Sequence, residues 1–191
     1  MIWFSFQLFK VHHDVSTVLS YRPMVEGILT ENDSTTNEDL VLAMIYTETK
    51  GKEVDLMQSS ESSTGLINTI TDSRESVRQG ITVLSENLAK ATANETDVWT
   101  AVQAYNFGSA YIDYVARHGG KSTIDLAKEY SKSVVAPSLG NQTGDTYRYY
   151  HPVALFYGGG ELYRNGGNIY YAKQVQCHLL LIKLMSYFKK G

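Results

Sequence analysis

Cysteine is nearly absent from this 191-residue chain. Cys177 is the only one, so no disulfide bond can form within the chain. It stands in an apolar stretch with helical spacing, and we interpret it as a small core residue rather than a nucleophile. Scarce cysteine does not exclude export, because it shows only that the fold does not depend on crosslinks.

A basic excess is also lacking. The chain has 17 Lys and Arg against 20 Asp and Glu, a formal net charge of −3, and no basic stripe. Nucleic acid is therefore not an expected partner. No two histidines stand four residues apart with a carboxylate, and neither a phosphate-binding loop nor a Gly-x-Ser-x-Gly elbow is found. We expect neither a metal nor an organic cofactor.

Long hydrophobic runs are missing too, since spanning a bilayer takes about 20 apolar residues. Residues 1–9 are mostly apolar, but they lack a basic leader and a small-residue cleavage site. Two interpretations of residues 1–30 stay open. They are the first turns of an amphipathic helix, or the remnant of an export segment or membrane anchor that begins upstream. We assign residues 31–191 to the main domain.

Helical periodicity dominates the rest of the chain, with no strand alternation and no internal repeat. Pro23 is predicted to interrupt the first helix, and Thr35 and Glu38 have the spacing of a capping box for the next. Residues 138–169 are rich in Gly, Tyr and Asn and are predicted to be loops. The pattern indicates a single all-α domain whose long loops can form a cleft. The predicted helices cover residues 2–21, 38–48, 73–93, 97–107, 109–118, 123–136 and 170–188. Asp72 is a candidate cap for the third, Thr96 or Asp97 for the fourth, and Ser122 or Thr123 for the sixth.

Glu48 ends the second of these regions, before a plausible helix stop at Gly51. A carboxylate there meets the negative end of the helix dipole, which together with partial burial raises its pKa. Such an acid suits cleavage of a glycosidic bond, where the leaving oxygen must be protonated. Taken alone, a Glu at a helix end is more often a solvated side chain.

Two further motifs are weak by themselves. The first is Met57-Gln58-Ser59-Ser60-Glu61-Ser62, and a sequence of this kind is usually a polar loop. The second is Ala104-Tyr105-Asn106-Phe107-Gly108, which is usually a helix C-cap, because Asn and Gly both favour that position.

Taken together and in this order, the motifs resemble those of bacterial lysozyme-like peptidoglycan hydrolases, relatives of goose-type lysozymes and lytic transglycosylases. The likeness includes Glu48-Thr49 and Met57-Gln58, and it extends through Tyr105-Asn106-Phe107-Gly108 to Tyr111-Ile112-Asp113. Tyr171, four residues before Val175, also fits a Gram-positive subgroup. The resemblance implies a lysozyme-like helical fold and cleavage of the β-1,4 bond between N-acetylmuramic acid and N-acetylglucosamine.

The resemblance also implies roles for single residues. Glu48 becomes the general acid, and Tyr171 is expected to stand close to it. The other side chains are expected to bind sugar groups or line the cleft, namely Thr49, Gln58, Ser59, Ser60, Tyr105 and Asn106. Two departures matter: Asp55 replaces a usual glycine before Leu56, and residues 138–169 form a longer stretch than expected.

A second carboxylate is the open point of the mechanism. Asp55, Glu61 and Asp72 are near enough in sequence, and Glu61 is the first choice because it belongs to the Met-Gln-Ser-Ser-Glu-Ser motif. A structural role for Glu61, bonding the loop backbone, is equally compatible with the sequence. Lytic transglycosylases need no second carboxylate, because the substrate itself completes the reaction.

Tyrosine is abundant, with 14 in the chain. Exposed rings can stack on sugars, but for any one tyrosine a core position is the favoured interpretation.

The resemblance implies an enzyme at the bacterial cell surface or outside the cell, with peptidoglycan glycan strands as its partner, and we expect it to be a monomer. A binding protein that retains the fold without cutting, and an adhesin acting through its Tyr- and Gly-rich loops, are the alternatives.

Overall fold

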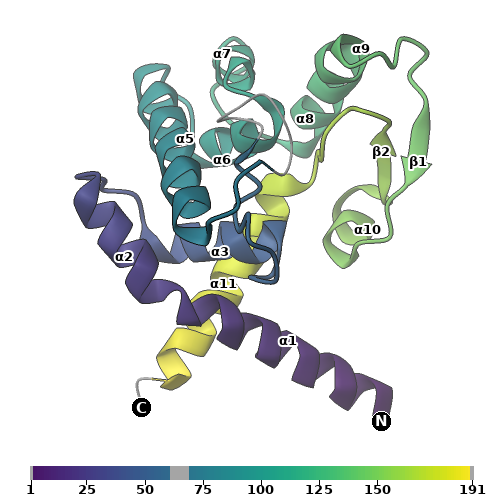
Figure 1. The fold of residues 1–191 in the computed structure, drawn as a ribbon. Helices are drawn as coiled ribbons and strands as arrows, with labels where there is room; N and C mark the ends of the chain where they lie inside the picture. The colour runs from purple at the N-terminus through teal and green to yellow at the C-terminus, as the bar shows by residue number, and fades with distance from the viewer. Residues whose placement is uncertain (1, 61–68, 190–191) are drawn as a thin grey trace. The chain divides into compact units, whose positions relative to one another are not determined.

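The computed structural model describes residues 2–60 and 69–189, and its backbone forms two compact units. Unit 1 contains Met1–Ser85 and Val175–Gly191, and unit 2 contains Glu86–Gln174. Two long helices, α5 (Ser73–Ala93) and α11 (Tyr171–Lys189), run from one unit into the other (Figure 1). The described part of the chain is mostly helical, with one small two-stranded sheet. The predicted all-α class is confirmed.

Unit 1 is built around α3 (Glu38–Glu48), which contacts α1 (Ile2–Ser20) and α2 (Arg22–Glu31). Every side chain from Leu40 to Tyr46 is buried, so this helix has no polar face. The N-cap is Asn37, whose side-chain oxygen accepts a hydrogen bond from Leu40 N at 3.0 Å. The predicted capping box at Thr35 was therefore two residues too early. Among the described residues, no helix is long and apolar enough to cross a bilayer.

Both internal prolines predicted to end helices stand in first turns. Pro23 is in the first turn of α2, and Pro137 is in the first turn of α9 (Ala136–Ser138), directly after a π-helical turn at Ser131–Val135. First-turn N–H groups have no acceptor within the helix, so proline loses no hydrogen bond there. α1 ends at Ser20, so the predicted interruption near Pro23 is confirmed. The helix predicted to end before Pro137 continues to Ser138, because a sequence pattern does not show which turn a proline occupies.

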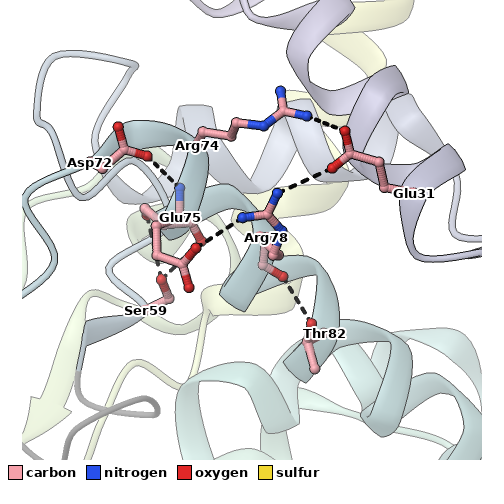
Figure 2. Close-up of polar contacts among 8 residues, drawn as sticks. Glu31, Ser59, Asp72, Arg74, Glu75, Arg78 and Thr82 are labelled. Carbon is pink, nitrogen blue, oxygen red and sulfur yellow. Dashed lines mark hydrogen bonds and ion pairs between the residues drawn. The ribbon is translucent and has the colours of Figure 1, made fainter.

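Ion pairs join α2 to α5 on the surface of unit 1. Arg74 and Arg78 of α5 both contact Glu31 at the end of α2, as Figure 2 shows. The hydrogen bond from Arg78 and the charge of Arg74 lower the pKa of the Glu31 carboxyl. Because Glu31 is fully exposed, water screens these pairs, and they orient α2 more than they stabilise it.

Unit 2 has an aromatic core. Tyr111 and Tyr130 are buried, and their rings lie 5.1 Å apart edge to face beside Phe107. Burial raises the pKa of Tyr111 to about 12, although its hydroxyl lies 2.9 Å from Ser122 Oγ. For these tyrosines the core interpretation is confirmed. Around them are α6 (Val98–Phe107), α7 (Ala110–Ala116) and α8 (Ile124–Tyr130), and Asp97 and Thr123 cap α6 and α8 as predicted.

Residues 138–169 are more ordered than predicted. They contain β1 (Thr146–Arg148), α10 (Pro152–Gly158) and β2 (Glu161–Tyr163), and β1 pairs antiparallel with β2 so that Tyr147 lies opposite Leu162. Three-residue strands are too short for their alternation to be seen in a sequence. Gly160 requires its residue type, because a Cβ there would lie 2.7 Å from the carbonyl oxygen of Tyr149.

Gly80 provides a test of packing in unit 1. A Cβ on this α5 residue would lie 2.8 Å from Met57 Cβ, so Gly80→Ala should lower the free energy of unfolding by about 1–3 kcal/mol. Gly27 in α2 is the matched control, because the nearest atom to its Cβ would be 3.9 Å away. Gly27→Ala should stabilise by about 0.5–1 kcal/mol. Urea unfolding measures both, and equal signs would contradict the packing at Met57.

Candidate functional site

Glu48 is the last residue of α3 and is half-buried. The first residue of the following loop is the C-cap of this helix. Thr49, the C-cap residue, is buried, and its hydroxyl donates to Leu56 O at 2.9 Å and accepts from Gly51 N at 3.2 Å. The predicted sugar-binding hydroxyl of Thr49 is thus engaged inside unit 1. Its contact closes the turn that begins directly after Glu48.

The residues before Glu48 contact His178 in the part of α11 that belongs to unit 1. Thr47 Oγ1 donates to Ala43 O at 2.7 Å and lies 2.8 Å from His178 Nδ1. Because the single hydroxyl proton is used on Ala43, the imidazole must donate from Nδ1. The His178 ring also lies 4.6 Å from the ring of Tyr46. This contact could not be predicted from the sequence, since a lone histidine in a helix is uninformative.

The loop after α3 is anchored to α1. Asp14 is buried in α1 and forms an ion pair of 2.6 Å with Lys52 of the loop. Burial alone would raise the pKa of Asp14, but the hydrogen bond and charge of Lys52 outweigh it and lower the pKa. Tyr21 OH donates to Gly51 O at 3.2 Å, which gives the loop a second attachment.

The Met-Gln-Ser-Ser motif is folded around the carboxylate of Asp55. That carboxylate accepts hydrogen bonds from Ser59 N at 3.0 Å, Ser60 N at 3.1 Å, Ser60 Oγ at 2.5 Å and Ser76 Oγ at 2.6 Å. Ser59 Oγ donates to Ser76 O at 2.9 Å. Ser59 and Ser60 are both buried, so the hydroxyls predicted to meet sugar organise the loop.

Gln58 differs from the serines that follow it. Its side chain is exposed, and its backbone has a left-handed φ of 49°. Its amide Nε2 donates to Glu53 Oε2 at 2.8 Å and to Asp55 O at 3.3 Å. Of the motif residues predicted to bind substrate, Gln58 is the one whose side chain reaches the surface of unit 1.

Unit 2 contains the other predicted residues, and it brings them together. The rings of Tyr105 and Tyr171 are stacked, with centroids 6.3 Å apart and planes 8° from parallel. Asn106 Oδ1 accepts a hydrogen bond from Asn168 N at 2.7 Å. A Cβ on Gly167 would lie 2.9 Å from that oxygen, so glycine is needed beside it.

Buried amides that the sequence interpretation missed hold this arrangement. Gln103 donates to Asn168 O at 2.9 Å and accepts from Ala172 N at 3.1 Å, which joins α6 to the start of α11. The side chain of Asn168 donates to Gln174, and Gln174 donates to the hydroxyl of Tyr149 at 2.9 Å. A glutamine one turn before the Tyr-Asn motif was the available signal, but its helical position made it look like an ordinary polar residue.

Comparison with known proteins identifies the family. A model of the lysozyme-like family matches residues 15–179. The chain belongs to the lysozyme-like family. It is 62% identical to a pneumococcal vaccine antigen A homolog of Streptococcus pyogenes, over 98% of this chain and 94% of that protein. It is 56% identical to pneumococcal vaccine antigen A of Streptococcus pneumoniae, over 96% and 89%.

Two more distant relatives have informative names. A bifunctional muramidase/DL-endopeptidase of Bacillus subtilis is 40% identical over 94 residues, 49% of this chain and 28% of that protein. A solved structure from Staphylococcus aureus, described as similar to a lipoprotein of the NLP/P60 family, has a TM-score of 0.75 at 32% identity. The match covers 86% of the lysozyme-like chain and 52% of that structure, so the chain spans about half its length.

Three carboxylates were candidates for a second catalytic group, and the structure places two of them. Burial would raise the pKa of Asp55, but the hydrogen bonds from Ser60, Ser76 and the loop backbone outweigh it and lower the pKa. Asp55 therefore stays ionised, with both oxygens already occupied. Asp72 accepts from Glu75 N at 2.9 Å at the start of α5, as the sequence predicted for a helix cap. Glu61 lies outside the described residues.

No group of three His, Cys, Asp or Glu side chains that could hold a metal ion occurs in the described ranges 2–60 and 69–189. The site residues that the structure does describe are oxygen and amide donors and acceptors with aromatic rings. In unit 1 these are Glu48 and Gln58, and in unit 2 they are Tyr105, Asn106 and Tyr171. Such groups suit hydrogen bonding and stacking to sugars.

Asp55→Asn tests the loop anchor. The substitution replaces one acceptor oxygen by an NH2 group that faces hydrogen-bond donors. It should lower the free energy of unfolding at pH 7 by about 2 kcal/mol. Because the native pKa of Asp55 is lowered from 3.8, its stabilisation is present above that pH and is lost as the pH falls through the native value. The difference between wild type and variant should therefore shrink in acid. Urea unfolding from about pH 7 to pH 2 measures it, with Glu26→Gln as control. A difference that stayed constant with pH would rule out the ionised anchor.

Proposed function

We propose that this chain is a peptidoglycan hydrolase that cleaves the β-1,4 bond between N-acetylmuramic acid and N-acetylglucosamine, as a muramidase or a lytic transglycosylase. The observation that carries the proposal is the position of Glu48, half-buried at the C-terminal end of α3 within the region that matches the lysozyme-like family. The related muramidase of Bacillus subtilis supports peptidoglycan as the substrate class.

Glu48 is assigned the role of general acid. It transfers its proton to the glycosidic oxygen as the bond from that oxygen to the anomeric carbon of the muramic acid breaks. Glu48 is the last residue of α3, and the negative end of a helix dipole favours a protonated carboxyl there before the transfer. The turn closed by Thr49 and the anchor at Asp55 keep the backbone that follows the acid in one arrangement.

The positive charge that develops at the anomeric carbon can be resolved in two ways. In a muramidase, a water molecule adds there after a second carboxylate removes its proton, and Glu61 is assigned that role. In a lytic transglycosylase, the 6-hydroxyl of the muramic acid attacks instead and passes its proton to the carboxylate that Glu48 has become, which leaves a 1,6-anhydro end. Neither route requires a metal or an organic cofactor.

The remaining groups are assigned to substrate binding. Gln58 presents an exposed amide that Glu53 orients, and it suits hydrogen bonds to sugar hydroxyl or acetamido groups. Tyr105 and Asn106 are assigned to glycan binding, since a ring and an amide at a helix end are typical sugar contacts. Tyr171 is only 2% exposed, and it supports the ring of Tyr105 by stacking on it. Thr49, Ser59 and Ser60 contribute by fixing the loop, because their hydroxyls are buried.

The proposal places the protein at the bacterial cell surface or outside the cell as a monomer, with glycan strands as its partner. A binding protein that keeps the fold without cutting is the second candidate. The presence of a carboxyl group at position 48 favours the enzyme, because a pure binder has no use for an acid at this helix end.

Glu48→Gln is the decisive substitution. The amide cannot donate a proton to the leaving oxygen, so turnover of purified peptidoglycan should fall by at least about 100-fold. Mass spectrometry of the soluble products measures the loss, and Glu26→Gln in α2 serves as an exposed-carboxylate control that should keep full activity. Lysis that survived Glu48→Gln would refute the mechanism. An absence of products from the wild type as well would favour the binding protein.

Glu61→Gln separates the two reaction courses. If the wild type releases reducing muramic acid ends, Glu61 activates the water and Glu61→Gln should lower turnover by about 100-fold or more. If the products carry 1,6-anhydro ends, the same substitution should leave turnover within about threefold of wild type, because no water is activated. Reducing ends together with an unaffected Glu61→Gln variant would contradict the assignment of Glu61.

A further inference from the structure

The segment between α9 and α11 exposes more aromatic surface than a folded chain usually leaves uncovered. We call residues 141–170 the insert, which contains β1, α10 and β2 and is drawn in green to yellow in Figure 1. Tyr150 is 81% exposed and Phe156 is 82% exposed. Leu155, Tyr157 and Tyr147 are also exposed. Exposed apolar groups gathered in one segment indicate a binding surface more often than chance.

The exposure is not the result of a loosely attached loop. Tyr170 OH donates to Gly158 O at 3.0 Å, and Gln174 donates to the hydroxyl of Tyr149, so both sides of α10 are tied down. Asn141 Nδ2 donates to Asp145 O and to Arg164 O, at 2.9 and 2.8 Å, which closes the base of the insert. The exposed rings are therefore carried on an ordered support, and little conformational entropy is lost when they bind.

Cations accompany the rings. The guanidinium of Arg164 lies 6.0 Å from the centre of the Tyr147 ring, and the ammonium of Lys173 lies 5.6 Å from that of Tyr157. Arg148 reaches the end of α10, where it donates to Gly159 O at 2.8 Å. Asp145 and Glu161 belong to the same segment, so the two arginines of the insert are balanced in charge. The flat rings, rather than a net charge, therefore complement a polymer that presents apolar sugar faces.

The insert is continuous with the proposed sugar contacts of unit 2. From Tyr149, hydrogen bonds run through Gln174 to Asn168, and the backbone of Asn168 donates to Asn106. Tyr170, which supports α10, directly precedes Tyr171, which stacks on Tyr105. A chain of bonds within one unit thus connects the exposed rings to the groups assigned to the glycan.

We propose that the insert is an additional binding surface for glycan strands, centred on Tyr150 and Phe156 and continuous with the groups of unit 2 that are assigned to the glycan. The identity of the polymer as peptidoglycan rests on the proposed function, whereas the surface itself rests on the exposed rings. A lipid surface fits less well, because adsorption to anionic lipid usually requires clusters of about four to eight basic residues.

Binding to insoluble cell wall tests the proposal. Co-sedimentation with purified peptidoglycan sacculi measures the dissociation constant, in a Glu48→Gln background that prevents cutting. The double variant Tyr150→Ala/Phe156→Ala should raise this constant about tenfold relative to the parent protein. The matched control is Tyr187→Ala/Phe188→Ala in α11, which removes rings that are 77% and 69% exposed but belong to unit 1. The control should bind like the parent protein. Equal binding by both doubles, or equal loss in both, would overturn the proposal.

Further measurements separate this surface from the proposed activity. In the active enzyme, the Tyr150/Phe156 double should raise KM for sacculi and leave kcat unchanged on short soluble glycan fragments. A loss of kcat on the fragments would make the insert part of the cleavage site and overturn a separate surface.

If the parent protein does not cut but the Tyr150/Phe156 double variant still loses binding to sacculi, the proposed function fails and the binding surface stands. Binding lost only to phosphatidylglycerol vesicles would replace the glycan by a lipid. Unchanged unfolding temperatures establish that each double is folded, and single Tyr150→Ser and Phe156→Ser variants repeat the test if a double is not.

Discussion

The carboxylate of Asp55 is the interaction on which the loop after Glu48 depends. A buried charge is costly unless it is fully hydrogen-bonded, and here two backbone N–H groups and two hydroxyls converge on it. Those donors belong to the Ser59-Ser60 turn and to Ser76 of α5, so one side chain fixes the loop to a helix. Ser60 then accepts from Thr69 N and Ile70 N at 3.1 and 3.0 Å, which extends the same centre to the other end of the loop.

The fold was largely predictable from the sequence because its helices are long and end in recognisable caps. The stretch 73–93 and the caps at Asp72, Asp97 and Thr123 agree with the structure. The predictions that failed concern elements that are short or whose form depends on tertiary contacts. The strands at 146–148 and 161–163 are too brief for any period to show, and the helix predicted to end before Pro137 continues through a π-helical turn to Ser138.

The candidate site was also predictable only in part from the sequence. The motif residues were recognisable from resemblance, but sequence could not tell which side chains face outward. Ser59 and Ser60 differ from Gln58 because the carboxylate at position 55 draws their donors inward, while the left-handed backbone of Gln58 leaves its amide exposed. Gln103 and Gln174 were missed because their partners are backbone groups and side chains far along the chain, and no local pattern records such pairs.

The continuity of α5 and α11 has a consequence for how the protein is made. Unit 2 is one uninterrupted stretch of chain, whereas unit 1 is assembled from two stretches separated by 86–174. During synthesis from the N-terminus, unit 2 therefore has all of its residues before unit 1 does. Residues 175–189 of α11 follow unit 2 in the chain, and they bring His178 to Thr47 and Ser186 to Arg22. The surroundings of Glu48 are therefore completed only after this part of α11 has been synthesised, so a nascent chain contains the aromatic core of unit 2 before the contacts beside the proposed acid can form.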